Sequence, residues 1–324
     1  MGAENKTAKK ANIYFRRCGG FVKIAFPWLI SAALLIYSLW GVDFQLLAVS
    51  FQNYPLAWSC LVIFAAQVGY AVSAWRFQGL AGGKAAYGTV LKGIIIGFGY
   101  NNILPAKAGE ILKILYLAKA SGVPAAGIGA IVFWERVFDV LLLLSLSLCL
   151  FAFGFQPVPV YVPLGMLCVG ILCFLWAKRY SHFFHGWYQK IPSKRISGIL
   201  GRLHVDAVDS VSWRWLFRGL WKTTVLWLVY MSTYVAGFLL VASLNIQLWQ
   251  AAIAFIAASI ALAIPSSPGG IGMLEGAVVF SLSWFDIPRE SSLAIALFLH
   301  AAYFLPVTLL AIFIFGSSLK KRKL

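Results

Sequence analysis

Apolar residues gather along this chain in long runs that are separated by short polar or basic stretches. A membrane-spanning helix needs about 20 consecutive, mostly apolar residues, and six runs are close to that length or longer. The predicted full spans are Ile24–Val42, Pro55–Trp75, Ala125–Phe153, Val158–Ala177, Thr223–Ser243 and Ser292–Phe315. The first run is too long for a signal peptide, and the sequence GVDFQLL that follows has no small-residue cleavage site. It therefore predicts an uncleaved first helix.

Two further apolar stretches, Gly93–Leu104 and Ala251–Ile264, are too short to cross a membrane. They run into the helix-breaking sequences PAKAGE and PSSPGGIG. Each then resumes as a second short helical segment, over Ala106–Ala118 and Gly272–Ser283. This pattern predicts two re-entrant helical hairpins, over about 93–118 and 251–284.

Composition agrees with a membrane protein, because 61% of the 324 residues are hydrophobic and 11% are charged, against about 25% charged in a soluble protein. The net charge of +17 would suit a nucleic-acid binder, but the chain has too little water-facing sequence for that role. The five cysteines lack metal-ligand or disulfide spacing. His182 and His185 could be two ligands on one helix turn, but their aromatic neighbours favour an interfacial belt. We therefore predict no metal and no cofactor.

Lysine and arginine indicate the sidedness of the chain, because cytoplasmic loops are enriched in them. Basic residues cluster in the N-terminal tail, in the loop 178–222 and at the C-terminus. Six spans and two hairpins that return to their own sides place all three clusters on the cytoplasmic side, together with a short connection that carries Arg76 and Lys84. The two hairpins then enter from opposite sides, as in an inverted repeat.

The predicted fold class is therefore an all-α polytopic membrane protein with cytoplasmic termini. Its expected parts are a basic tail (1–23), a single transmembrane domain (24–316) and a second basic tail (317–324). Within the loop 178–222, apolar positions at helical spacing predict amphipathic helices on the anionic inner leaflet. A solvated basic loop that only sets the orientation is the alternative.

Ionisable residues at membrane depth are the candidate functional groups, because a charge near the bilayer centre costs about 2.5–3.5 kcal/mol. They are Lys107, Glu110 and Lys113 in the first hairpin, Glu135, Arg136 and Asp139 in the span after it, and Glu275 in the second hairpin. Glu135 and Asp139 share a helix face, while Arg136 and Asp139, like Glu110 and Lys113, are spaced to pair. These groups either line a cavity or form internal ion pairs that satisfy one another.

The two hairpin tips suggest an anion site. If Pro105 opens a half-helix, its free amides and Lys107 place positive charge in the middle of the membrane. In the other tip, Ser266 or Ser267 could cap a half-helix that is opened by Pro268. Nearby glycines would let the backbone approach a ligand. The alternative for PSSPGGIG is an exported surface loop that reverses the chain.

Three segments resemble a known family: NNILPAKAGEILKI (101–114), ERVFD (135–139) and PSSPGGIGMLEGAVV (265–279). They are similar to the transmembrane region of lysylphosphatidylglycerol synthases, the flippase part of the bacterial multiple peptide resistance factor, and to its stand-alone membrane-protein relatives. The resemblance implies movement of a lipid between leaflets of a prokaryotic cytoplasmic membrane. Lysine at 107 stands where arginine is common. The chain ends at KKRKL, so the aminoacyl-transferase domain of the bifunctional synthases is expected to be absent.

The resulting hypothesis is a flippase for an anionic phospholipid or lipid-linked phosphate, bound between opposed half-helix termini. The expected substrate-binding residues are Asn101, Asn102, Pro105, Lys107, Gly109, Lys113, Arg136, Ser266, Ser267, Gly269, Gly270 and Gly272. The expected gating or proton-coupling residues are Glu110, Glu135, Asp139 and Glu275. Expected partners are membrane lipids and either a second copy of the chain or a lipid-modifying enzyme. The alternatives are a membrane-embedded enzyme that acts on a lipid-linked phosphate or sugar, and an ion or solute channel.

Overall fold

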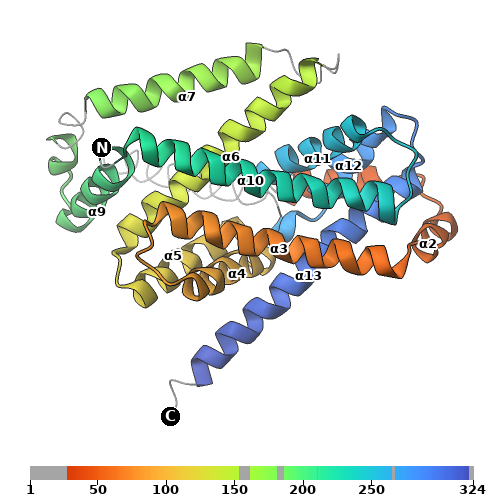
Figure 1. The fold of residues 1–324 in the computed structure, drawn as a ribbon, viewed down its shortest axis with the longest axis horizontal. Helices are drawn as coiled ribbons and strands as arrows, with labels where there is room; N and C mark the ends of the chain where they lie inside the picture. Colours follow the sequence, from red (N-terminus) through yellow and green to blue (C-terminus); the bar gives the residue numbers. More distant parts are fainter. Residues whose placement is uncertain (1–27, 153–160, 181–185, 210, 265–266, 321–324) are drawn as a thin grey trace, which may run out of the picture.

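A computed structural model describes residues 28–152, 161–180, 186–209, 211–264 and 267–320, and most of these residues are helical with no strand among them (Figure 1). The elements, in chain order, are a helix over Trp28–Leu39, α2 (Phe44–Gln52), α3 (Leu56–Leu80), α4 (Tyr87–Ile103), η1 (Pro105–Lys107), α5 (Ala108–Ser121), α6 (Ala125–Ala152), α7 (Tyr161–Arg179), α9 (Lys194–His204), η2 (Val205–Asp209), α10 (Trp213–Ala236), η3 (Gly237–Val241), α11 (Leu248–Ala263), η4 (Pro268–Gly270), α12 (Met273–Ser283) and α13 (Arg289–Lys320). The labels η1 and η4 mark 3₁₀ turns, and η2 and η3 mark π-helical turns.

Three helices are long and apolar enough to cross a membrane: Leu56–Leu80, Trp213–Val241 and Arg289–Phe315. The helix Trp28–Leu39 and α2 would together make a fourth span, although they are bent by 85° at the break between them. The chain is thus a multi-pass membrane protein. Helices α6 and α7 also occupy the predicted spans Ala125–Phe153 and Val158–Ala177. The count of six spans, the inverted repeat and the cytoplasmic termini stay predictions.

Pairs of packed antiparallel helices occupy both predicted hairpin regions, α4 with α5 and α11 with α12. Helix α4 begins at Tyr87, before the predicted bound of 93, and the re-entry of each pair into the membrane stays a prediction. In Figure 1 the first pair lies in the left half of the molecule and the second pair in the right half, while α3 and α10 run across both halves. The turn of each hairpin points toward the middle. There the short turns η1 and η4 contact each other, so the two tips meet inside the bundle.

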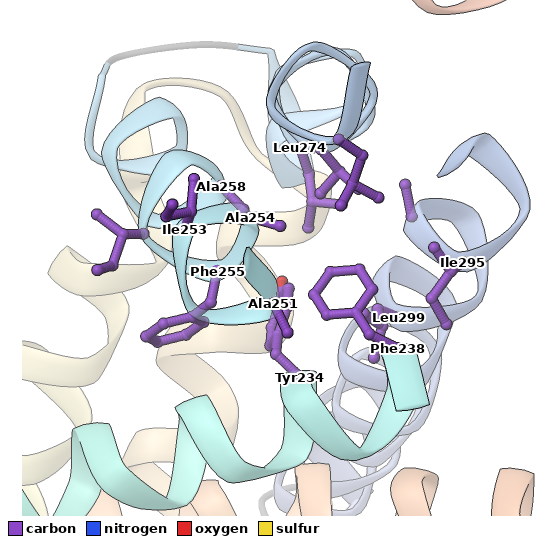
Figure 2. Close-up of a cluster of buried hydrophobic side chains, with 14 of the residues drawn as sticks. Tyr234, Phe238, Ala251, Ile253, Ala254, Phe255, Ala258, Leu274, Ile295 and Leu299 are labelled. Carbon is purple, nitrogen blue, oxygen red and sulfur yellow. The ribbon is translucent and has the colours of Figure 1, made fainter. Parts of the chain in front are cut away.

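Each hairpin has its own apolar core against the long helices. Tyr234 of α10, Phe255 of α11, Leu274 of α12 and Leu299 of α13 belong to the core of the second hairpin (Figure 2). A separate cluster joins α3, α4, α5, α6 and α13 around the first hairpin, and its buried members include Phe77, Ile94, Leu117, Ile128 and Val307. Each hairpin is therefore anchored along its length, and its tip is held where the two cores adjoin.

The connection that was expected to carry Arg76 is in fact helical. Helix α3 continues past Trp75 to Leu80, because the sequence RFQGL contains no strong helix breaker. The chain turns only at Gly82 and Gly83, which have φ of 62° and 74°. Arg76 is consequently buried inside the bundle, and its assignment to a cytoplasmic connection was wrong.

The loop 178–222 contains helix α9 and the first turns of α10, which begins at Trp213 rather than at Thr223. The hydroxyl of Ser193 caps α9 by accepting from the amide of Ile196 at 3.4 Å. Helix α9 packs against the start of α6, while Ile196 and Ile199 stay exposed. The helical part of the loop prediction is therefore confirmed, and its contact with a leaflet stays a prediction.

Candidate functional site

Glu135 of α6 is the centre of a buried group of charges. Its two carboxylate oxygens accept from different cations, at 3.1 Å from Nη2 of Arg76 and at 2.8 Å from Nζ of Lys113. The side chains of all three residues are at most 4% exposed. Arg76 belongs to α3 and Lys113 to α5, so this carboxylate links three helices.

Asp139, one helical turn further along α6, extends the group. Its Oδ1 atom lies 2.5 Å from Nη1 of Arg76 and accepts from the indole Nε1 of Trp227 at 3.0 Å. Its Oδ2 atom is 3.6 Å from Nη1 of Arg136. Glu135 and Asp139 thus share one helix face, as their spacing predicts, and Arg76 contacts both.

The outer end of this group is an ion pair between Arg136 and Glu110, with 2.6 Å between Nη2 and Oε1. The Arg136 side chain is 44% exposed, in contrast to the buried Arg76. We call the six residues Arg76, Lys113, Arg136, Glu110, Glu135 and Asp139 the ion network. It contains three cations and three carboxylates, and pairing of this kind offsets the cost of burying charge in an apolar bundle.

Two expectations about pairing change. Glu110 and Lys113 do not pair along α5, because Lys113 points to Glu135 and Glu110 points to Arg136. Glu135 and Asp139 of α6 are also not paired by Arg136 alone, because Arg76 and Lys113 are the cations that pair with Glu135. Arg76 was absent from the predicted site. If the predicted helix Pro55–Trp75 had been extended by one turn, Arg76 would have been recognised as another charge at membrane depth.

At the first hairpin tip, the half-helix starts later than Pro105. Leu104 is extended, Pro105 opens the 3₁₀ turn η1, and α5 begins at Ala108. Lys107 precedes α5 in the left-handed conformation with φ of 54°. Its side chain is exposed, and no carboxylate of the described residues lies within ion-pair distance of it. Arg136 and Glu110 are nonetheless close enough to Lys107 to interact with its charge.

The asparagines and the glycine of this tip have mainly packing contacts. The amide of Asn102 donates to the hydroxyl of Thr308 at 2.8 Å, which ties α4 to α13. Gly109 allows α5 to approach α4, because an added Cβ would lie 2.5 Å from the backbone nitrogen of Asn101. The Oδ1 atom of Asn101 is buried, with no hydrogen-bond partner among the described residues.

At the second hairpin tip, the capping prediction for the serines is wrong for Ser267. Its hydroxyl donates to the carbonyl of Ile271 at 2.9 Å, and its amide donates to Ser31 at 3.0 Å. Pro268 opens only the short turn η4, and α12 begins at Met273. Pro265 and Ser266 lie outside the described residues.

The N-terminus of α12 has an acidic partner within the chain. The amide of Gly272 donates to Oε2 of Glu275 at 2.8 Å, an arrangement that a Gly-x-x-Glu sequence can form. Positive φ values at Gly269, Gly270 and Gly272 shape the turn before it. An anionic ligand at this terminus would therefore face the carboxylate of Glu275, and the expected symmetry between the two half-helix termini is lost.

His300 of α13 completes the second tip, and the sequence did not assign it a role. Its Nδ1 lies 2.5 Å from Oε1 of Glu275, and its Nε2 lies 3.1 Å from the carbonyl oxygen of Gly269. The side chains of His300 and Glu275 are 12% and 3% exposed. The lone histidine in a predicted span was the available signal, because an ionisable residue at that depth needs a partner.

The structure thus divides the predicted site into two groups of charged residues. The ion network and Lys107 belong to the first hairpin and α6, whereas Glu275 and His300 belong to the second hairpin and α13. The groups adjoin at the tips, where a Cβ on Gly269 would lie 3.5 Å from the carbonyl oxygen of Asn102.

Among the described residues, no group of three or more histidine, cysteine, aspartate or glutamate side chains is placed to hold a metal ion. His182 and His185, the pair with possible ligand spacing, lie outside those residues.

Comparison with known proteins identifies the family. Residues 24–311 match the family model described as the lysylphosphatidylglycerol synthase TM region. No curated protein and no solved structure matches the chain. The matched segment includes both hairpins, the ion network and the long helices that hold them. Because the match covers most of the 324 residues, the chain belongs to the family of the lysylphosphatidylglycerol synthase TM region, which is linked to membrane lipid handling.

Proposed function

We propose that this protein moves an anionic lipid between the two leaflets of a prokaryotic cytoplasmic membrane, with the head group bound beside Lys107. The observation that carries the proposal is the position of Lys107. It is an exposed cation without an ion-pair partner among the described residues, and it lies at the tip of a hairpin that ends inside the bundle.

The backbone of Lys107 supports a functional role for its side chain. A left-handed conformation costs an L-residue roughly 1–2 kcal/mol, and glycine avoids this cost. Strained residues of this kind cluster at ligand clamps and active sites. A lysine ammonium is a compact charge with three donors, which suits a phosphate oxygen. The cost of this backbone conformation therefore fits a role for the Lys107 charge in binding a phosphate.

The ion network supports separate roles for its cations. Arg76 and Lys113 are held by buried carboxylates, so releasing either one would leave a charge unpaired in an apolar interior. Arg136 is half exposed, and its partner Glu110 is also accessible. A phosphate could replace Glu110 at Arg136 without exposing the buried pairs. We therefore assign head-group binding to Lys107 and Arg136, gating to Glu110, and a structural role to Lys113 and Glu135.

The opposed hairpins supply a route through the membrane in this proposal. With six spans and each hairpin returning to its own side, the tips lie near the midplane, as in transporters built from broken helices. A head group would then cross between two short half-membrane paths. Many large apolar side chains on the outside of the helices are exposed, which suits contact with acyl chains that stay in the bilayer.

Lipid exchange in vesicles tests this function. The purified full chain is reconstituted into vesicles that carry a fluorescent phosphatidylglycerol, and a membrane-impermeant quencher measures how much of it changes leaflet. We expect exchange with the wild-type protein and a loss of at least about tenfold with Lys107→Asn. Asparagine tolerates the left-handed backbone, so this substitution removes the charge without adding strain.

Lys119→Asn is the matched control, because Lys119 is an exposed lysine on α5 that lies near the base of the same hairpin. It should exchange lipid like the wild type. Full activity of Lys107→Asn would remove head-group binding from Lys107. A wild-type protein that chemically converts the lipid, instead of returning it unchanged, would contradict the transport proposal.

A further inference from the structure

Both ring nitrogens of His300 face hydrogen-bond acceptors. Nδ1 lies 2.5 Å from a carboxylate oxygen of Glu275, and Nε2 lies 3.1 Å from the carbonyl oxygen of Gly269. A backbone carbonyl can only accept, so Nε2 must carry a proton for this contact. The contact at Nδ1 also needs one proton, which is located either on Nδ1 or on Glu275.

This geometry fixes the number of protons that the pair holds. An imidazolium beside an ionised carboxylate carries two protons, and so does a neutral imidazole beside a protonated carboxyl group. In both forms the pair has no net charge, which suits its burial. If one proton leaves, either the carboxylate or the carbonyl faces a nitrogen lone pair, and one of the two contacts becomes repulsive.

His300 and Glu275 each hold one end of the turn at the second hairpin tip. His300 binds the carbonyl of Gly269 at the start of the turn, and Glu275 accepts from the amide of Gly272 at its end. Both glycines have positive φ, and their turn is the part of this hairpin that meets the first one. The pair therefore connects α13 to the turn that contacts the tip of the first hairpin.

The surroundings offer few other groups that could exchange this proton. Tyr234 of α10 is close enough to Glu275 to interact with its charge, and Tyr303 of α13 lies one turn from His300 beside Tyr230 and Tyr70. Within their described ranges, α11 has no ionisable side chain, α12 has only Glu275, and the helix Trp28–Leu39 has only Tyr37. The charged side chain of α4 is Lys92, near the helix end that lies away from the tip, and Tyr100 is nearer to the tip. The turn η1, which contacts η4, carries Lys107.

We propose that Glu275 and His300 together form a proton-binding site that ties the second hairpin tip to α13 while it holds two protons and releases the tip when one proton leaves. The tie is complete at low pH and is lost as the pH rises. Coupling of this release to lipid movement rests on the proposed function. The proton site itself rests only on the contacts of His300 and Glu275.

Amide hydrogen exchange of the reconstituted full chain tests the site without reference to lipid transport. The peptide that covers 267–274 is followed from about pH 5.5 to 8.5, and the rates are corrected for the intrinsic base catalysis of amide exchange. In the wild type we expect the corrected rate to rise by about tenfold or more, because a charge-assisted hydrogen bond is lost. His300→Gln cannot titrate and should show no such rise.

His204→Gln is the matched control, because His204 is a buried histidine on α9 that contacts Tyr188, far from the tip in the fold. It should keep the wild-type rise. Should His300→Gln fail to fold, Glu275→Gln replaces it and should likewise abolish the rise. An unchanged corrected rate in the wild type, or a rise that persists in His300→Gln, would overturn the proton site.

Parallel measurement of lipid exchange separates this proposal from the proposed function. A pH-dependent tip in a protein that moves no lipid would support the proton site and reject the transport function. Lipid exchange together with a tip that ignores pH would support transport and overturn the proton site.

Discussion

Nη2 of Arg76 and Oε1 of Glu135 lie 3.1 Å apart, although the two residues are 59 positions apart in the chain and both side chains are almost completely buried. This contact joins α3 to α6, and Lys113 adds α5 through the other oxygen of Glu135. The charges that make the first hairpin unusual for a membrane segment therefore also hold it in place. Substitutions in the buried part of the ion network should mainly lower stability, and substitutions in its exposed part should mainly lower function.

Replacing Arg76 should destabilise the protein strongly. Arg76→Gln removes the partner of two carboxylates, one of them fully buried, and breaking a buried pair in this way costs about 3–5 kcal/mol. Thermal unfolding in detergent measures the effect. Arg218→Gln is the control, since Arg218 is exposed on α10 and a surface substitution changes stability by about 0.5 kcal/mol or less. Equal stability of the two variants would show that the buried pair does not hold the bundle.

Replacing Arg136 should change stability little but reduce lipid exchange strongly. Its pair with Glu110 is partly exposed, and exposed ion pairs contribute about 1 kcal/mol or less. Arg136→Gln should therefore unfold close to the wild-type temperature but lose most lipid exchange in the vesicle assay. A variant that exchanges lipid normally would remove Arg136 from the head-group site, and one that unfolds like Arg76→Gln would give it a structural role instead.

The hairpins were predictable because their signals are local. Apolar runs of about half a span that end in Pro and Gly indicate a broken helix, and the structure has a helix pair in both predicted regions. The start of the first pair was missed, because α4 extends back to Tyr87 through the sequence YGTVLK before the apolar run. Glu275 as a partner of its own helix terminus was also readable from the Gly-x-x-Glu spacing. Ser267 was misassigned because α12 begins only at Met273, so the Ser267 hydroxyl donates to the carbonyl of Ile271 and accepts from no helix amide among the described residues.

The pairing of the charges was not predictable, because it depends on how distant helices pack. Glu110 and Lys113 are well spaced for a pair on α5, yet each binds a residue of α6 instead. Arg76 was lost when the span was ended at Trp75, one residue before it. The contact of His300 with Glu275 likewise depends on the packing of α12 against α13. Spacing identifies the groups, and tertiary structure decides the partners.

Two helical glycines should respond to alanine in opposite directions. At Gly109 a Cβ would press on the backbone of α4, 2.5 Å from the nitrogen of Asn101, and overpacking of this kind costs about 1–3 kcal/mol. At Gly129 of α6 the nearest atom would be a Leu203 methyl at 3.5 Å, an ordinary contact. Gly129→Ala should therefore raise stability by about 0.5–1 kcal/mol. Thermal unfolding of both variants measures the difference, and a neutral Gly109→Ala would mean that α4 and α5 can separate at the tip.

The opposed entry of the hairpins predicts which surfaces reach water on each side of the membrane. Ala120 and Ser283 are exposed residues near the ends of α5 and α12, at the base of each hairpin. Cysteines at these two positions should react with a membrane-impermeant thiol reagent from opposite sides in sealed vesicles. The exposed native residues Cys60, Cys149 and Cys168, together with Cys18 and Cys173, are first replaced by serine.

Two more positions show whether each hairpin returns to its own side. Lys84 lies at the entry of the first hairpin and Asn245 at the entry of the second, and both are exposed. Lys84→Cys should label from the same side as Ala120→Cys, and Asn245→Cys from the same side as Ser283→Cys. If Lys84 and Ala120 label from opposite sides, α4 and α5 cross the membrane together as one broken span. The tips would then no longer face each other from opposite leaflets, and a head group at Lys107 would have no second half-path to continue along.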